Sequence, residues 1–379
     1  MVEPALGRLG SSVKNPGQSN LTIATNKSSV SKVMNSQAIP RAYRRPILIW
    51  IASICGLVVL TLIVGGATRL TNSGLSITEW KPLIGALPPL SEADWMRTFE
   101  LYKQIPEYSI EHSQMDLAGF KFIFFWEYLH RNMGRLIGLV FLFPFLFFWL
   151  RGALPRPLFK RVLLGFFLGG LQGGMGWFMV MSGLSERTDV SHYRLAAHLG
   201  LAIFIFYHFF QILLELLSKS EERLQKRNLK VSRNILILQI LLSLQIIYGA
   251  FVAGLRAGYS YNTFPKMNGD WFPSLGFSMQ PLFINFFENP ALVQFIHRWL
   301  GAGLVLGIFI FILMLPKSVI SPMAKKLMNS LVIMILIQFL LGVFALLSHL
   351  SFAIALIHQF GALVVFALLQ SLSFSYKRI

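Results

Sequence analysis

Eight long runs of apolar residues constrain this 379-residue chain more than any other feature of its sequence. Each run has the roughly 20 residues that a helix needs to cross the hydrocarbon core of a bilayer. Lipid offers no partners to backbone polar groups, so helices are expected and open strands are excluded. The runs cover residues 46–67, 120–149, 159–181, 192–217, 234–255, 291–315, 326–348 and 352–374. The sequence therefore predicts an all-α polytopic membrane protein with eight transmembrane helices.

The charges support a membrane protein rather than a nucleic-acid-binding one. Hydrophobic residues make up 55% of the chain and charged residues only 13%, yet the formal net charge is +18. Lys and Arg are separated by long apolar runs and do not cluster on one soluble face. If the spans alternate in direction, the basic groups fall on one side of the membrane, at residues 41–45, 151–161, 219–233, 317–326 and 377–378. By the positive-inside rule both termini are then cytoplasmic, or lie in a mitochondrial matrix.

The same pattern suggests four segments. Residues 1–42 are rich in Ser and Asn and are predicted as a disordered basic tail. Residues 43–218 and 234–379 each hold four spans, and residues 219–233 link them on the cytoplasmic or matrix side. The only cysteine, Cys55, lies within an apolar run, so an internal disulfide, a CxxC pair and a thiolate zinc site are excluded.

The two halves repeat a histidine pattern. A His-Arg-x-x-Gly string begins at His130 in the second span and recurs at His297 in the sixth. A second histidine lies near the outer end of the fourth span, His198, and of the eighth, His358. Because each half has an even number of spans, two repeated four-helix bundles in the same orientation fit this pattern.

Four histidines in matching positions of apolar helices indicate metal binding. Ionisable side chains are costly inside a membrane, so such residues are expected to have a function. A four-helix bundle can enclose a porphyrin, with one histidine from each of two facing helices reaching the iron. We therefore predict two haem sites, one between His130 and His198 and one between His297 and His358.

The halves differ in one acidic residue. Glu127 precedes His130 by three residues on the same helical face, whereas Gln294 holds the corresponding place before His297. A carboxylate in an apolar span needs a partner or a function. The site beside Glu127 is therefore the candidate for chemistry. Arginines near the outer ends of the spans are expected to bind the anionic haem propionates; they are Arg69, Arg131, Arg194 and Arg298.

Three local strings carry a family resemblance. They are GGATRLTNSGLS at 65–76, WKP at 80–82 and WEYLHR at 126–131. With them, residues 43–375 resemble the haem A synthase family of mitochondria and alphaproteobacteria. One branch of that family has a cysteine pair in an outer loop. Because Cys55 is alone and lies within a span, the chain resembles the cysteine-free branch.

The resemblance implies an oxidoreductase. In such enzymes the C8 methyl of haem O is hydroxylated twice, through the alcohol haem I, and the product loses water to give the formyl group of haem A. His297 and His358 would hold a haem b cofactor, and His130 and His198 would receive substrate haem O. Glu127 would assist proton transfer or stabilise charge beside the methyl. The expected partners are a haem O synthase (farnesyltransferase), an electron donor such as ferredoxin and membrane lipid, and a homo-oligomer is left open; no nucleic acid is expected.

Two other classes stay open from the residues alone. A di-haem, cytochrome b-like electron-transfer subunit would keep both haems permanently, and a transporter could also have repeated halves. The difference between Glu127 and Gln294 favours the synthase. All four histidines lie towards the outer side rather than at mid-bilayer, which disfavours the transporter. The tail lacks an Arg-rich amphipathic helix, which favours a bacterial inner membrane over the mitochondrial inner membrane.

Overall fold

The computed structural model describes residues 39–79, 84–181, 183, 190–218, 229–315 and 321–375. Most of the predicted tail, most of the predicted linker and the WKP string lie outside these residues. The first long helix begins at Arg41 and the fifth at Leu229, each slightly before the predicted start of its half.

Eight helices of the described chain are long and apolar enough to cross a membrane, which confirms the predicted class. The described residues contain no β-strand, only an isolated bridge between Met267 and Asp270. The eight helices are α2 (Arg41–Leu70), α5 (Leu117–Leu150), α6 (Arg156–Met181), α7 (His192–Leu217), α8 (Leu229–Gly254), α10 (Pro290–Leu313), α11 (Pro322–Leu347) and α12 (Phe352–Ser375). The protein is therefore a multi-pass membrane protein.

Side-chain caps define where two of these helices begin. Asp116 precedes α5, and its carboxylate accepts a hydrogen bond of 2.8 Å from the backbone N–H of Gly119. Asn289 precedes α10 and accepts from the N–H of Ala291 at 2.9 Å, with Pro290 as the first helical residue. Both caps satisfy backbone donors that a helix start leaves without partners. Polar residues thus end the loops where the apolar runs begin.

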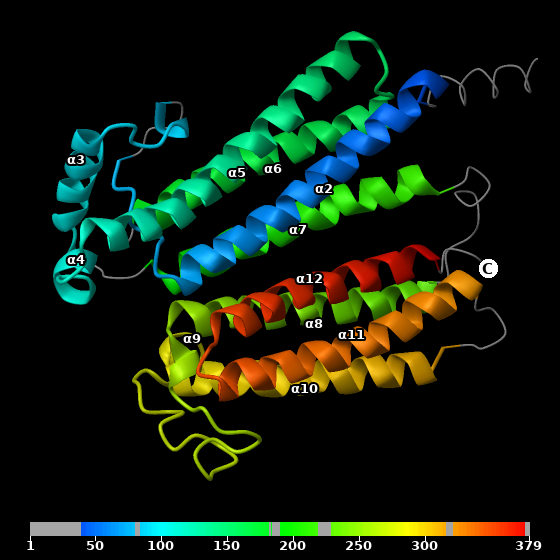
Figure 1. The fold of residues 1–379 in the computed structure, drawn as a ribbon. Coiled ribbons are helices and arrows are strands. Elements are labelled where there is room, and N and C mark those ends of the chain that lie inside the picture. The colour runs from blue at the N-terminus through cyan, green and yellow to red at the C-terminus, as the bar shows by residue number, and fades with distance from the viewer. Residues whose placement is uncertain are drawn as a thin grey trace, which may run out of the picture.

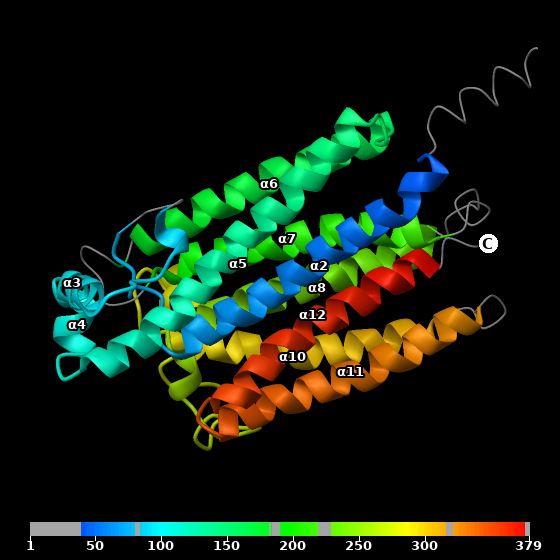
Figure 2. The ribbon, with the colours of Figure 1, turned by 45° about the horizontal axis from the view of Figure 1, so that its top comes forward.

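The eight helices form two groups of four (Figure 1). Helices α2, α5, α6 and α7 pack together, and so do α8, α10, α11 and α12. The groups meet where α7 packs on α8 and where α12 packs on α2 and α7 (Figure 2). The start of α2 and the end of α12 lie at the same end of the bundle, as eight alternating spans require. Which end faces the cytoplasm stays a prediction.

The apolar core is concentrated towards the end of the bundle where α2 starts. Fully buried residues there include Ile47, Ile51, Ile308 and Leu369. Large apolar side chains on the outside of the helices, such as Phe167, are exposed, as expected for surfaces that face lipid. The opposite end of the bundle carries the four predicted ligand histidines.

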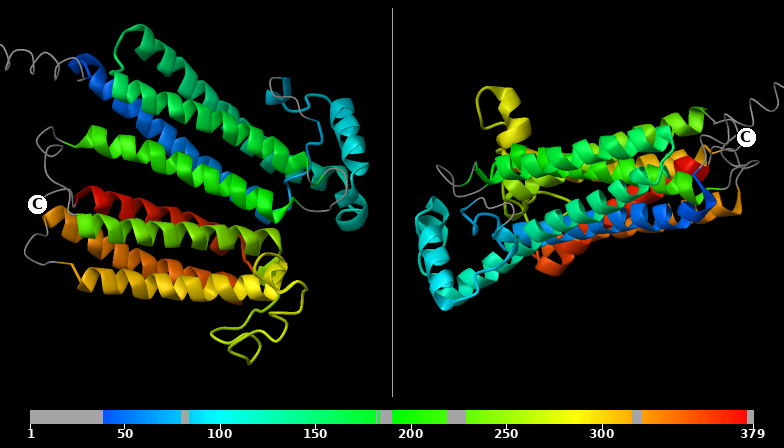
Figure 3. Two further views of the ribbon diagram at one scale, coloured as in Figure 1. Left: turned by 180° about the vertical axis from the view of Figure 1, so that it is seen from behind. Right: turned by 90° about the horizontal axis from the view of Figure 1, so that it is seen from above.

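A folded cap covers that opposite end of the first group (Figure 3). It contains α3 (Glu92–Lys103) and α4 (Pro106–Glu111). Its apolar core joins the cap to the start of α5 and consists of Leu75, Phe99, Tyr102, Ile105, Phe120, Ile123 and Phe124. The other group has an outer loop with two 3-10 turns, Ala257–Tyr259 and Leu282–Ile284, and the short helix α9 (Asn285–Glu288).

A polar cluster inside the cap joins three titratable residues. The Tyr102 hydroxyl donates to the Glu107 carboxylate at 3.1 Å and lies 2.6 Å from Nδ1 of His112. Burial raises the pKa of Tyr102, and the charge of Glu107 raises it further. Burial lowers the pKa of His112; Glu111 opposes this shift and Arg256 adds to it. The Arg256 guanidinium also forms an ion pair of 2.7 Å with Glu111, which ties the cap to the second group.

Candidate functional site

Each of the four predicted ligand histidines lies against a glycine of a neighbouring helix. A β-carbon built on that glycine would lie within 3.2 Å of the imidazole Cε1 in every case. Carbon atoms pack best at about 3.5 to 4.0 Å, so any larger residue would displace the ring. The pairs, with the distance from Cε1 to the added carbon, are His130–Gly65 (2.7 Å), His198–Gly176 (3.1 Å), His297–Gly249 (3.2 Å) and His358–Gly342 (2.8 Å).

The structure brings His297 of α10 and His358 of α12 together. Their ring centroids are 6.4 Å apart, and the ring planes are inclined by 81°. With metal–imidazole bonds of about 2 Å on either side, an iron between two rings places their centroids on the order of 6 Å apart. Nδ1 of His358 also lies 3.1 Å from the backbone oxygen of Gln338. A hydrogen bond at one ring nitrogen leaves the other for a metal.

The structure also brings together His130 of α5 and His198 of α7. The two imidazoles are close enough to interact electrostatically, and both residues are partly buried. The ring of His130 lies against the backbone of Thr61 in α2. The side-chain amide of Gln172 in α6 donates to the backbone oxygen of His198 at 3.1 Å. Each group of four helices therefore contains one neighbouring pair of histidines, and haem binding by either pair stays a prediction.

The residues present fit a haem with two axial histidines. Nδ1 of His130 lies beside Gly65 and the backbone of Thr61, and Nδ1 of His297 lies beside Gly249 and the backbone of Gln245. Because Nδ1 faces the neighbouring helix, Nε2 of each ring is left for a metal, as in His358. The part of the chain that the structure describes holds no group of three or more His, Cys, Asp or Glu that could bind a bare ion. Paired histidines suit a porphyrin, which supplies the other iron ligands itself.

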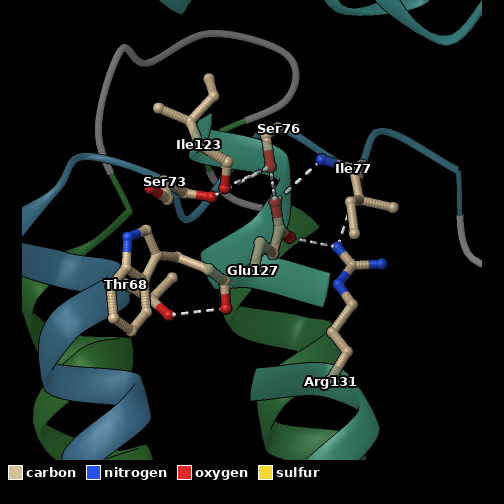
Figure 4. A network of polar contacts seen from close by, with 8 residues as sticks. Thr68, Ser73, Ser76, Ile77, Ile123, Glu127 and Arg131 are labelled. Atoms are coloured by element: carbon tan, nitrogen blue, oxygen red, sulfur yellow. Dashed lines mark hydrogen bonds and ion pairs between the residues drawn. The ribbon is translucent and has the colours of Figure 1, made fainter. Parts of the chain in front are cut away.

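Glu127 is buried and receives three hydrogen bonds (Figure 4). Its Oε2 accepts from the Ser76 hydroxyl at 2.7 Å and from the backbone N–H of Ile77 at 2.8 Å. Its Oε1 accepts from Arg131 at 2.6 Å, and Arg131 also donates to the backbone oxygen of Ile77 at 2.9 Å. Hydrogen bonds to a carboxylate are strong when the group is ionised. Glu127 therefore joins α5 to the loop that follows α2.

The corresponding position in the second group uses an amide. Gln294 donates to the backbone oxygens of Ala257 at 2.8 Å and Tyr261 at 3.2 Å. Its Oε1 accepts from Arg298 at 2.8 Å, and Arg298 donates to the backbone oxygen of Tyr261 at 2.7 Å. The two groups thus share an arginine contact and a loop contact. Glu127 carries a charge and accepts from its loop, whereas Gln294 is neutral and donates to its loop.

The predicted propionate-binding arginines lie at the loop end of the bundle, and each contacts the protein. Arg69 donates to the backbone oxygen of Ala253 at 2.8 Å, across the junction of the two groups. Arg194 donates to the oxygen of Phe178 at 2.6 Å and lies 3.7 Å above its ring. Arg298 has a buried Nε without a hydrogen-bond partner in the described chain. Their binding of propionates stays a prediction.

The structure explains much of the string at 65–76. Gly65 makes room for His130, and Gly66 makes room for Gln359, whose amide donates to the backbone oxygen of Leu62 at 2.7 Å. The Thr68 hydroxyl lies 3.1 Å from the backbone oxygen of Trp126 (Figure 4). Ser76 then reaches Glu127. The string joins α2 both to the histidine helix α5 and to the second group.

Comparison with known proteins agrees with this arrangement. A family model described as Cytochrome oxidase assembly protein matches residues 48–370. The chain belongs to this family. It is 45% identical to a Heme A synthase of Rhodospirillum centenum over 334 residues, which cover 88% of each chain. It is 44% identical to a Heme A synthase of Nitrosospira multiformis over 326 residues, 86% of this chain and 92% of that protein. A Heme A synthase of Maricaulis maris is 43% identical over 337 residues, 88% of this chain and 97% of that protein.

In this member of the cytochrome oxidase assembly protein family, three residues near the histidines were not predicted from the sequence. They are glutamines of neighbouring helices, and each donates from its amide to the backbone oxygen of a ligand histidine. The pairs are Gln172–His198 (3.1 Å), Gln245–His297 (2.9 Å) and Gln338–His358 (2.8 Å). Each glutamine lies four residues before the glycine that its histidine contacts. A search for Gln-x-x-x-Gly within the spans could have found them.

Proposed function

We propose that this chain is a haem A synthase, which oxidises the C8 methyl of haem O to a formyl group. The methyl is hydroxylated twice, by way of haem I, and the resulting diol loses water to leave the aldehyde. The observation that carries the proposal is the pair of unlike sites, one with a buried Glu127 beside its histidine and one with Gln294. The high identity to proteins named Heme A synthase, over most of the chain, supports the same reaction.

His297 and His358 are the proposed ligands of a haem b cofactor. Their centroid separation suits two imidazoles on opposite sides of one iron. A haem b at this site supplies one-electron chemistry when bound. The chain's own contribution is to fix the two rings: Gly249 makes room for His297, and α11 holds His358 through Gly342 and the backbone oxygen of Gln338.

His130 and His198 are the proposed ligands of the substrate haem. Glu127 lies one helical turn from His130 towards the cap, and its carboxylate holds the 76–77 segment in place. We assign it the task of stabilising positive charge or accepting a proton beside the reacting methyl. Arg69, Arg131, Arg194 and Arg298 are the proposed partners of the haem propionates.

The proposed location is the inner membrane of a bacterium, with both termini cytoplasmic and the cap on the periplasmic side. Bacterial relatives and the positive-inside pattern support this orientation. The mitochondrial inner membrane, with the termini in the matrix, is the alternative location. Proposed partners are a haem O synthase that supplies the substrate and an electron donor such as ferredoxin.

The test is expression in a host whose membranes contain haem O but no haem A. Haems are extracted with acid and separated by chromatography, with the Glu127→Gln variant and an empty vector as controls. We expect haem A only when the active chain is present. Unchanged haem O together with a haem b-loaded protein would instead favour the cytochrome b-like electron-transfer subunit, a class that the named relatives do not favour.

A further inference from the structure

Three of the four histidine sites share one helix-to-helix contact. A glutamine amide donates to the backbone oxygen of the histidine, as given above for Gln172, Gln245 and Gln338. The same amide nitrogen also lies close to the imidazole. The distances to the nearest ring nitrogen are 3.2 Å for Gln172, 3.4 Å for Gln245 and 3.2 Å for Gln338. One side chain therefore restrains both the position of the histidine helix and the rotation of the ring.

The glutamines fit into the facing helices. A β-carbon on Gly301 would lie 3.1 Å from Nε2 of Gln245, and one on Gly361 would meet Oε1 of Gln338. In these two pairs each helix thus provides a glycine for the other's side chain. The Oε1 atoms of Gln172, Gln245 and Gln338 are buried and have no hydrogen-bond partner among the described residues. These amides are held by packing and by donation to the histidine helix.

The His130 site lacks this contact. The residue four places before Gly65 is Thr61, whose short side chain donates to the backbone oxygen of Leu57 in its own helix at 2.8 Å. Gly134 corresponds to Gly301, but a β-carbon on Gly134 would meet no heavy atom within 4 Å. Among the described residues, no side chain corresponding to Gln245 therefore reaches Gly134, and at this level of α2 the ring of His130 contacts the backbone of Thr61.

A substrate haem and a cofactor haem make opposite demands on their ligands. The cofactor must stay bound through many turnovers, whereas the substrate must enter and its product must leave. At least one histidine of the substrate site must therefore release the iron in each cycle. Contacts that orient a metal ligand typically change metal affinity by about 10- to 100-fold, so their presence or absence can distinguish a fixed ligand from a releasable one.

We propose that Gln172, Gln245 and Gln338 are positioning residues that fix their histidines as permanent ligands, and that Thr61 leaves His130 as the releasable ligand. This inference rests on the proposed assignment of the two haem sites. Beyond that assignment, it identifies the side on which the substrate haem loses its ligand. This is the side of α2 and α5, where Glu127 also lies. The fixed ligand of the substrate haem is then His198.

The test measures haem release from the intact protein in detergent, with apomyoglobin as the acceptor. Gln245→Leu is compared with Gln239→Leu, which removes another buried amide of α8. Thr61→Gln is compared with Thr61→Val, which removes the hydroxyl but keeps the side chain short. We expect Gln245→Leu to accelerate loss of haem b by about tenfold or more and to shift its low-spin electron paramagnetic resonance signal. Gln239→Leu should leave both unchanged.

Thr61→Gln should slow release of haem from the other site by a similar factor, while Thr61→Val releases it at the wild-type rate. Wild-type release and an unshifted signal in Gln245→Leu would overturn the role of the glutamines. Wild-type release in Thr61→Gln would overturn the role of Thr61. A wild-type protein that binds haem but makes no haem A refutes the proposed function instead, so the two failures are distinguishable.

Discussion

The contact between Gly342 and His358 allows a quantitative prediction. In Gly342→Ala the new methyl carbon would lie 2.8 Å from Cε1 of His358 and 3.4 Å from its Nδ1. Restoring a normal carbon–carbon contact of about 3.5 Å requires the ring to move by roughly 0.7 Å. Nδ1 would then be displaced relative to the backbone oxygen of Gln338, which it now faces at 3.1 Å.

Overpacking of this kind typically costs about 1 to 3 kcal/mol. Since 1.4 kcal/mol corresponds to a factor of ten, haem b should bind about 5- to 150-fold more weakly. Gly303→Ala in α10 is the matched control, because its β-carbon would meet no heavy atom within 4 Å. Both variants gain the same helix propensity, about 1 kcal/mol. A difference in haem binding between them therefore measures the effect of the contact with His358.

The assay is haem content per protein by the pyridine haemochrome spectrum, followed by the rate of haem transfer to apomyoglobin. Gly342→Ala should be depleted of haem b and should lose the remainder faster than Gly303→Ala. Gly249→Ala should have a smaller effect, since its added carbon would lie 3.2 Å from His297. A wild-type haem content in Gly342→Ala, or equal loss in both variants, would refute the reasoning.

Three further predictions concern the cap and the acidic residue. Glu127→Gln should retain haem b but accumulate haem O or the alcohol intermediate in extracted membranes, because an amide has no negative charge and only one oxygen for the donors Ser76, Ile77 and Arg131; normal haem A output would remove its proposed role. Reversing either charge of the Glu111–Arg256 pair should speed hydrogen exchange in α4, by an effect of at most about 1 kcal/mol at these partly exposed sites, and reversing both should restore protection. Burial lowers the pKa of His112 in the folded cap below its ordinary 6.5, so the folded cap favours the neutral ring. The contribution of His112 to the stability of the cap is therefore complete at neutral pH. It is lost as the pH falls from 6.5 through the lowered pKa of the folded state. Hydrogen exchange of α3 and α4 should rise over that range in the wild type and much less in His112→Gln, and equal rises in both would exclude His112 as the cause.

The spans could be predicted from sequence because apolar length is a local property that a bilayer imposes on each helix. The ends were less predictable. α2 begins at Arg41, directly after Pro40, and α5 begins at Leu117, directly after its cap Asp116, so both helices start ahead of the apolar runs. The long connection between α2 and α5 gives no such local signal. It folds into a cap because its apolar cluster around Phe99 and Tyr102 packs against α5.

The candidate site was predictable where a residue type is rare. A histidine in an apolar span is conspicuous, and so is the unmatched Glu127. The contacts of Glu127 with Ser76 and Ile77 could not be predicted, because they depend on how the loop after α2 folds back onto α5. A single glutamine in a span is usually a packing residue, and only the repeated Gln-x-x-x-Gly spacing distinguishes Gln245.

The surroundings of the glycines near the histidines were the hardest feature of the site to predict from the sequence. Gly134 and Gly301 occupy the same place in the His-Arg-x-x-Gly string, so the sequence predicts the same surroundings for both. The structure separates them, because Gly301 faces the amide of Gln245 whereas Gly134 faces open space. This difference depends on how neighbouring helices are aligned along their axes. No local pattern in the sequence predicts that alignment.

The central claim is that the two histidine pairs hold different haems. It is tested most directly by identifying the haems bound to purified His297→Ala and His198→Ala, each produced in a host that supplies haem O. We predict that His297→Ala loses haem b and retains haem O, while His198→Ala retains haem b and loses haem O and its oxidised products. Loss of the same haem from both variants, or retention of haem b by His297→Ala, would contradict the account.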